Sequence, residues 1–267
     1  MTIDQIFFFW YNWYSVLNIG IVPEVSEKSL TNEITYPVRL NRYLALQQIC
    51  SRREADSLIS AGQVKINGMT AKLGTLVHEG DDVQALHAKK KKLVYYAFHK
   101  PKAIITHSPQ GKEKSIDDIL DTPEKVSPLG RLDKESRGLI LLSNDGRLTD
   151  LLLNPSHAHE KEYVVKVDKM IDEIFIKRLS EGVKLDDGYK TKPCRVSFID
   201  DKSFSIILTE GKKRQIRRMC ESQSRRVTDL VRTRILNIEL HHMLPGHFRR
   251  IVGPELDLLL KTVGLKK

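Results

Sequence analysis

The stretch that decides the fold reads Pro128-Leu129-Gly130-Arg131-Leu132-Asp133-Lys134-Glu135-Ser136-Arg137-Gly138-Leu139-Ile140-Leu141-Leu142-Ser143-Asn144-Asp145-Gly146. Its apolar run, residues 139–142, predicts a buried strand that an Asn-Asp-Gly turn closes. The carboxylate of Asp133 falls on the loop before this strand, between Gly130 and Gly138. Loops held by a rigid strand often display reacting groups, and glycines let a ligand or another backbone approach closely. An aspartate in such a loop more often only caps the turn, so the rest of the chain decides the role of Asp133.

The composition is that of a globular protein with a basic surplus. The chain has 267 residues, long enough for two domains, with 40% apolar and 29% charged residues. Its 44 basic residues outnumber 34 acidic ones, and nine of the basic residues lie between residues 212 and 234. A surplus of this kind favours a polyanionic partner, although basic proteins without one are common. Composition alone therefore leaves the partner open.

Metal-binding and disulfide patterns are missing from the sequence. The three cysteines, Cys50, Cys194 and Cys220, are far apart and form no Cys-x-x-Cys pair. The histidine clusters at residues 157–159 and 241–242 lack the spacing of metal ligands. We therefore expect no metal site and no disulfide framework, which fits a reducing, cytoplasmic location.

The first 36 residues form an extension of unknown role. Residues 6–22 are mostly aromatic or aliphatic, with Asn12, Ser15 and Asn18 as polar interruptions. Their length approaches a bilayer span, but the polar residues argue against a membrane helix, and no signal-peptide pattern is present. The alternatives are a peripheral anchor, an additional packing element and a start codon assigned too far upstream. We expect no stable membrane association.

Residues 37–88 are predicted to fold as a small helix-helix-hairpin domain. Apolar side chains at residues 40–44 follow helical spacing, and Ser51 with Glu54 forms a capping box that begins a second helix. Asn67-Gly68 is the strongest short hairpin signal, and it follows a predicted strand at residues 63–66. A closing strand is expected after Asp82.

A four-lysine linker, residues 89–92, leads into a second domain predicted at residues 93–262. Apolar or alternating runs predict strands at residues 93–98, 139–142, 161–167, 194–199, 203–208, 227–231 and 235–240. Helical patterns are found at residues 116–120, 148–152, 172–181, 214–220 and 255–260. The predicted fold class is therefore α+β, a small N-terminal domain followed by a mixed, mostly antiparallel domain. In the 214–220 helix, Arg214, Arg217 and Arg218 are expected to share one exposed face.

Three stretches, taken in order, carry a family resemblance. They are Gly130-Arg131-Leu132-Asp133, His159-Glu160-Lys161-Glu162-Tyr163 and Gly211-Lys212-Lys213-Arg214-Gln215-Ile216-Arg217-Arg218-Met219-Cys220-Glu221. Together they strongly resemble the signature of bacterial pseudouridine synthases of the RsuA, RluB, RluE and RluF branch, and look closest to its RluF members. The domain at residues 37–88 resembles the alpha-L RNA-binding module of a ribosomal small-subunit protein and of tyrosyl-tRNA synthetases. Because the resemblance begins only near Val38, we favour the upstream start codon for the extension.

The resemblance implies an enzyme that isomerises uridine to pseudouridine in RNA without cofactor or metal. In the family, the aspartate matching Asp133 is the catalytic nucleophile, and the tyrosine matching Tyr163 stacks on the flipped target base. A basic side chain accompanies the nucleophile; Lys212 and Arg214 are both candidates for that place, with Arg131 assisting. The expected substrate is large-subunit (23S) ribosomal RNA, with tRNA as a second candidate. The resemblance further suggests a monomer, and we expect no DNA partner.

The resemblance also suggests which residues contact RNA. These contacts are expected from Arg39, Arg42, Arg52, Arg53 and Lys65 in the first domain, and from Arg131, Gln215, Arg217 and Arg218 in the second. Residues 225–234 are expected to hold further phosphates, with an affinity that falls as salt rises. The rival hypothesis is a non-catalytic RNA-binding ribosome-assembly factor that retains the fold. The intact Asp133 and Tyr163 favour the enzyme, because a pure binding protein needs neither.

Overall fold

The computed structural model describes residues 34–86 and 92–265. The predictions for residues 1–36 and for the linker at residues 89–92 lie outside these ranges, apart from residues 34–36 and Lys92. Within the described ranges, no helix is long and apolar enough to cross a membrane.

Residues 34–86 form two short helices with small sheets. The elements are β1 (Val38–Arg39), α2 (Leu40–Leu46), α3 (Arg52–Ser60), β2 (Val64–Ile66), β3 (Met69–Thr70), β4 (Leu76–Val77) and β5 (Val83–Ala85). The capping box is confirmed: the amide of Glu54 donates to Ser51 Oγ at 3.3 Å, and the amide of Ser51 donates to the Glu54 carboxylate at 2.9 Å. The hairpin is confirmed as well, because Asn67 and Gly68, both with positive φ, join β2 to β3.

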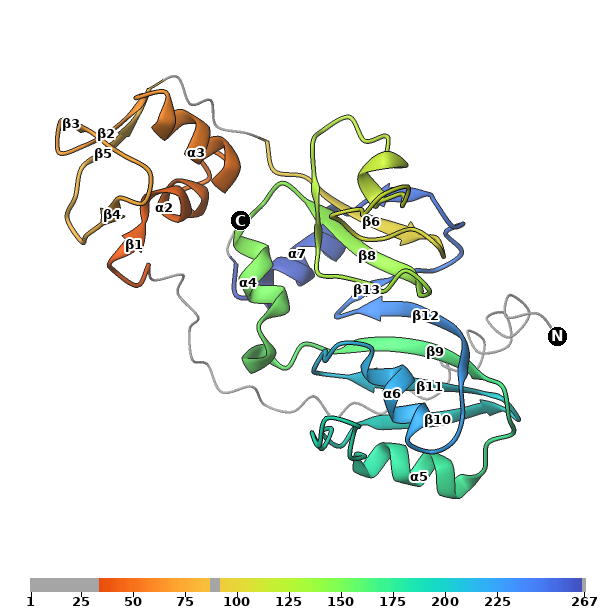
Figure 1. Cartoon of the computed structure of the whole chain (residues 1–267). Coiled ribbons are helices and arrows are strands. Elements are labelled where there is room, and N and C mark those ends of the chain that lie inside the picture. The colour runs from red at the N-terminus through yellow and green to blue at the C-terminus, as the bar shows by residue number, and fades with distance from the viewer. Residues whose placement is uncertain (1–33, 87–91, 266–267) are drawn as a thin grey trace. The chain divides into compact units, whose positions relative to one another are not determined.

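Residues 92–265 form one large sheet with helices and turns around it. Its strands are β6 (Tyr95–Lys100), β7 (Ser127–Leu129), β8 (Arg137–Ser143), β9 (Lys161–Val167), β10 (Arg195–Asp200), β11 (Ser203–Leu208), β12 (Val227–Ile235), β13 (Ile238–Glu239) and β14 (Phe248–Arg250). Its helices are α4 (Arg147–Leu153), α5 (Glu173–Glu181), α6 (Gln215–Glu221) and α7 (Gly253–Thr262), with short 3-10 turns at Ile116–Asp118 and Pro155–His157. Along the sheet the order is β10-β11-β9-β12-β8-β6-β14 (Figure 1). Only the β12–β8 pairing is parallel among these neighbours, so the predicted α+β class with a mostly antiparallel sheet is confirmed.

Apolar side chains alternate between the two faces of the central strand β8. Leu139 and Leu141 pack with residues of α4 and α7 in one core cluster, whereas Ile140 and Leu142 belong to a cluster on the other face. A third cluster brings β9 and β11 against α5 and α6. The register places this third cluster on the same face as Ile140, so the start of β8 lies between two apolar clusters.

The prediction of separate strands at residues 227–231 and 235–240 is wrong. β12 runs unbroken from Val227 to Ile235 along β9, and β13 folds back on its end. The charged residues in its middle are tolerated because their guanidinium groups have partners. Arg232 Nε donates to Leu139 O at 2.6 Å, and Arg234 Nε donates to the Glu162 carboxylate at 2.8 Å. A buried polar group that is hydrogen-bonded does not have to break a strand.

Gly138 is a point of close backbone approach between β8 and β12. Its φ is +113°, and a Cβ placed there would overlap the main chain of Arg232. We expect Gly138→Ala to lower the free energy of unfolding by at least about 3 kcal/mol, because both strands are held in the sheet. Gly146→Ala is the matched control, since its Cβ would have open space. Urea titration of the two variants gives the comparison, and equal unfolding midpoints would contradict this close approach.

Candidate active site

The loop that carries Asp133 is fixed to a second loop beside it. Thr106 Oγ1 donates to Leu132 O at 2.9 Å and accepts from the Leu132 amide at 3.1 Å. Within the Asp133 loop, the amide of Ser136 donates to Asp133 O at 3.0 Å. Asp133 as a whole is half-buried. The loop therefore combines a held backbone with a partly exposed carboxylate residue at the entrance to β8, as its sequence predicts.

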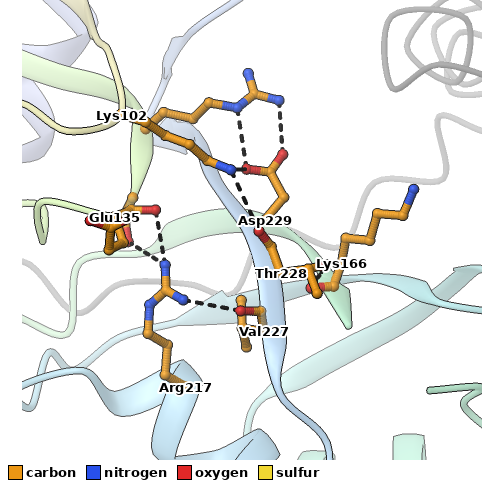
Figure 2. A network of polar contacts seen from close by, with 9 residues as sticks. Lys102, Glu135, Lys166, Arg217, Val227, Thr228 and Asp229 are labelled. Carbon is orange, nitrogen blue, oxygen red and sulfur yellow. Dashed lines mark hydrogen bonds and ion pairs between the residues drawn. The ribbon is translucent and has the colours of Figure 1, made fainter. Parts of the chain in front are cut away.

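Arg217 of α6 holds the same loop through a buried guanidinium group (Figure 2). It donates to Glu135 O at 3.0 Å, to Ser136 Oγ at 3.4 Å and to Val227 O at 3.2 Å. Only 7% of Arg217 is exposed, so the prediction that it lies on an open face of the helix is wrong. The short helix α6 buries residues 215–217 together with 219 and 220, a wider stripe than the helical period suggested.

The charge of Arg217 is placed among carboxylates. Burial lowers the pKa of its guanidinium, and the neighbouring Arg214 lowers it further. The carboxylates of Asp133, Glu135 and Asp229 act in the opposite direction. The Asp133 loop thus receives both hydrogen bonds and a positive charge from α6.

Lys100, at the end of β6, is a second buried cation near Asp133. No part of this residue is exposed, and its ammonium donates to Pro101 O at 2.7 Å and to Ile104 O at 2.5 Å. Burial lowers its pKa to about 8, while the charges of Asp133 and Glu135 raise it. Sequence reasoning missed this residue, because Lys100 lies just beyond the predicted strand at residues 93–98 and belongs to none of the three stretches that carry the resemblance. The Lys100-Pro101 pair could have drawn attention to this position, but a sequence does not show whether the lysine side chain is buried.

Strand register aligns Tyr163 with the start of β8. Gly138 pairs with Lys100 on one side and with Arg232 on the other, and Arg232 pairs in turn with Tyr163. Because directly paired residues point to the same face of a sheet, Lys100, Arg232 and Tyr163 form one row. Arg232 is buried and Tyr163 half-buried. The register therefore brings Tyr163 onto the sheet face from which Lys100 approaches Asp133.

Asp229 of β12 joins three segments beside the Asp133 loop (Figure 2). It pairs with Arg137, the first residue of β8, at 3.0 Å and with Lys102 at 2.7 Å. Burial alone would raise the pKa of Asp229, but hydrogen bonds and charge from the two cations hold it below its usual value. The cluster ties the loop after β6 to β8 and β12, which limits how far the Asp133 loop can shift.

Gln215 and Lys212 have partners other than the Asp133 loop. Gln215 Nε2 donates to the Glu210 carboxylate at 2.6 Å, and Gln215 Oε1 accepts from the Lys212 amide at 2.9 Å. Gln215 is buried, so the prediction that its side chain faces RNA is wrong. The Lys212 ammonium lies 4.5 Å from the centre of the Tyr189 ring. Glu210, which also accepts from Tyr189 at 2.6 Å, is thus the unforeseen residue that organises this turn.

The three arginines expected on one face of α6 have separate environments. Arg217 is buried against the Asp133 loop, and Arg218 forms ion pairs with Asp186 and Asp187. Arg214 is exposed at the residue that precedes α6. The structure therefore brings Arg217, which was predicted only as an RNA contact, onto the Asp133 loop. Of the two predicted basic partners, Lys212 lies over the Tyr189 ring and Arg214 is exposed.

Residues 225–234 do not form the predicted phosphate track. The Arg225 guanidinium lies 4.6 Å from the centre of the Phe175 ring, and Arg232 is buried. Arg234 pairs with the two glutamates of the 159–163 stretch. Within this segment Arg226 has a largely exposed side chain, at 78%. Most of the arginines in this segment therefore contact other residues of the same domain.

The remaining predicted RNA contacts are accessible. Exposed residues in the first domain include Arg39, Arg42, Arg52 and Arg53, and Lys65 on β2 is half-buried. Arg131, next to the candidate nucleophile in the second domain, is exposed as well. Accessibility is required of side chains that contact phosphate or sugar, so these positions keep their predicted role as hypotheses.

Both parts of the chain are similar to known RNA-modifying proteins. Residues 94–222 match the family model described as RNA pseudouridylate synthase, and residues 38–83 match that of the S4 domain. The chain is 42% identical over 231 residues to the dual-specificity RNA pseudouridine synthase RluF of Escherichia coli strain K12, an overlap of 85% of this chain and 79% of the relative. It is 32% identical over 232 residues to the ribosomal large subunit pseudouridine synthase B of Bacillus subtilis strain 168, with 83% and 95% covered. The crystal structure of a pseudouridylate synthase superposes with a TM-score of 0.63 at 26% identity, covering 83% of this chain and 99% of that one.

Proposed function

We propose, starting from the fact that this chain belongs to the RNA pseudouridylate synthase family, that Asp133 is the nucleophile with which it isomerises a uridine of large-subunit ribosomal RNA. The chain is an RNA pseudouridine synthase. The observation that carries the assignment of Asp133 is its loop: a partly exposed carboxylate residue on a backbone clamped by Thr106 from one side and Arg217 from the other. A reacting group must be both reachable and held in place, and this loop meets both conditions.

The reaction exchanges one bond to the uracil ring for another. The bond between ribose C1′ and uracil N1 breaks, and a bond between C1′ and C5 forms. The C5 proton leaves and N1 gains a proton, so the product has the same atoms as the substrate. An ionised carboxylate can hold one of the two pieces meanwhile, by adding to C1′ of the sugar or to C6 of the base. Asp133 supplies this carboxylate.

Arg217 and Lys100 act on Asp133 from behind the loop. Both side chains are buried, so they are not placed to contact RNA directly. Their proposed role is to position the loop and to supply positive charge. The bound RNA excludes water from the site, and fixed charges then act more strongly than in solvent. The target base must leave its stack to reach this loop, and base flipping is the expected route.

Tyr163 is proposed to stack on the flipped base and to help remove the C5 proton. We expect Tyr163→Phe to lower turnover roughly a hundredfold with little change in RNA affinity, because the ring remains but the hydroxyl is gone. Tyr163→Ala should weaken binding as well, since stacking is lost. Tritium release from RNA labelled at uridine C5 measures turnover, and filter binding measures affinity. If Tyr163→Phe were fully active, the hydroxyl would have no part in removing the C5 proton, and stacking would be the one role left for Tyr163.

The names of two relatives support the proposed substrate RNA. The Bacillus subtilis relative is named for the large ribosomal subunit, and the Escherichia coli relative for dual specificity. We accordingly propose a large-subunit uridine as the principal target and a tRNA uridine as the second. The exposed arginines of the first domain would dock the enzyme, a cytoplasmic monomer, on folded RNA.

The target is tested by chemical mapping of pseudouridines in total ribosomal RNA and tRNA, with and without the gene. We expect one large-subunit site to disappear on deletion and to return when the gene is restored. Loss confined to tRNA would contradict the large-subunit assignment. If every pseudouridine persisted, a non-catalytic role in ribosome assembly would become the better account.

A further inference from the structure

A polar pocket lies against Asp133, beside the candidate active site. It has a volume of about 220 Å³, and the described residues that line it come from two segments, 105–113 and 131–134. Tyr163, Arg217 and Lys100 belong to neither segment. The pocket therefore meets the catalytic loop at Asp133 without being part of the row of side chains on the sheet.

We propose that this pocket takes the nucleotide next to the target uridine, and that His107 and Gln110 determine which neighbouring nucleotides are accepted. The inference rests on the proposed role of Asp133. A uridine held at Asp133 is still linked through phosphates to the nucleotides on either side, so these nucleotides pass close to the loop that the pocket adjoins. Enzymes that act on flipped bases commonly select their sequence context through such neighbouring contacts.

The lining of the pocket suits a ribonucleotide. His107, Ser108 and Gln110 offer hydrogen-bond donors and acceptors, and Arg131 adds a positive charge. Glu113 also lines the pocket, and its charge is offset by Lys134 at 3.0 Å. That leaves Arg131 available for a phosphate. The volume is below the roughly 300 to 1,000 Å³ of most small-molecule sites, which favours part of a strand over an enclosed metabolite.

The 105–113 loop is anchored at its base and open at its tip. The Ile105 amide donates to Lys114 O at 2.9 Å, and Thr106 is bonded to the Asp133 loop. At the tip, Ser108 has a φ of +61°, and His107 Nδ1 lies 3.1 Å from Ser108 Oγ. The side chains of His107 and Gln110 are exposed. A loop that is anchored at its ends and presents exposed polar side chains beside the nucleophile is suited to contact a neighbouring nucleotide rather than to take part in the reaction.

The test compares the double variant His107→Ala/Gln110→Ala with wild type. His242→Ala is the control, because His242 is an exposed histidine that does not line the pocket. The substrates are RNA stem-loops that contain the mapped target uridine, with the nucleotide on each side varied in turn. The measured quantity is the ratio of kcat/KM between the RNAs with the best and the worst neighbouring nucleotide. We expect this ratio to fall about tenfold in the double variant. Its KM for the best RNA should rise about tenfold, with kcat within about threefold of wild type.

A second measurement locates the neighbour directly. RNA with 4-thiouridine beside the target uridine is irradiated with the full-length enzyme, and the crosslinked peptide is identified by mass spectrometry. We expect crosslinks within residues 105–113. An unchanged sequence preference and KM in the double variant, or crosslinks confined to other segments, would overturn the proposal.

These outcomes are distinct from failure of the proposed function. The stem-loops are taken from whichever RNA the mapping identifies, so an enzyme acting only on tRNA would defeat the large-subunit assignment and leave this test intact. If Asp133 were not the nucleophile, the crosslink and the neighbour preference would still report whether the pocket holds the flanking nucleotide.

Discussion

Asp133→Asn is expected to abolish pseudouridine formation while leaving RNA binding close to that of wild type. The amide nearly matches the carboxylate in size and hydrogen bonding, and the loop is held through backbone groups and Thr106, none of which changes. What disappears is the charge that attacks the nucleotide. Removal of a nucleophile costs roughly 10^4-fold or more in turnover when no other group replaces it. Single-turnover conversion of the mapped RNA and filter binding on the same preparation separate the two effects.

Glu135→Gln is the matched control for Asp133→Asn. Glu135 is an exposed carboxylate two residues further along the same loop, and its contact with Arg217 uses the backbone carbonyl. Its replacement should leave turnover within about fivefold of wild type, as for a surface substitution that keeps the loop. If Glu135→Gln abolished turnover and Asp133→Asn did not, the nucleophile would have been assigned to the wrong carboxylate.

Arg217→Met is expected to impair both stability and turnover. The methionine fills part of the space but leaves Glu135 O and Val227 O without their donor, and it removes a buried charge from beside the Asp133 loop. Loss of one partner in a buried charged network costs about 2 to 4 kcal/mol of the free energy of unfolding. With the loop no longer held, turnover should fall roughly a hundredfold to a thousandfold. Urea titration and single-turnover assays below the unfolding temperature give the two values.

Arg217→Lys distinguishes the charge of Arg217 from its geometry. A lysine retains the charge but, as a single ammonium, lacks the planar fork with which Arg217 bonds both Glu135 O and Val227 O. Compared with Arg217→Met, we expect Arg217→Lys to recover part of the lost turnover and a smaller part of the lost free energy of unfolding. Arg226→Met is the stability control, because the Arg226 side chain is 78% exposed. Wild-type turnover in Arg217→Met would remove Arg217 from the account of the site.

The fold was predictable wherever local patterns decide it. Alternation at residues 161–167 corresponds to β9 residue for residue, and Ser51 with Glu54 marked the start of α3 through a cap that requires no distant partner. β12 was predicted as two pieces, and Arg232 and Arg234 lie in the gap between them. Their partners, Leu139 O and Glu162, are distant in sequence, so no local pattern could show that both side chains find hydrogen-bond acceptors within one strand.

The candidate site was predictable in its loop but not in the groups behind the loop. Asp133 was identified from a short stretch that is itself the loop, and Tyr163 from the short stretch at residues 159–163 that runs into β9. Arg217 was placed with Arg214 and Arg218 because helical spacing treats them alike. Which arginine is buried depends on Val227 and Glu135 coming together around α6, a tertiary arrangement. Lys100 was missed for the same reason, since its neighbour Asp133 is distant in sequence.

The most direct test of the central claim, that the Asp133 carboxylate performs the isomerisation, is complementation at the mapped uridine. A strain lacking the gene receives wild type, Asp133→Asn or Glu135→Gln at equal protein levels, and pseudouridine at that site is quantified. We expect wild type and Glu135→Gln to restore the modification and Asp133→Asn to leave the uridine unmodified. Restoration of the site by Asp133→Asn would contradict this claim.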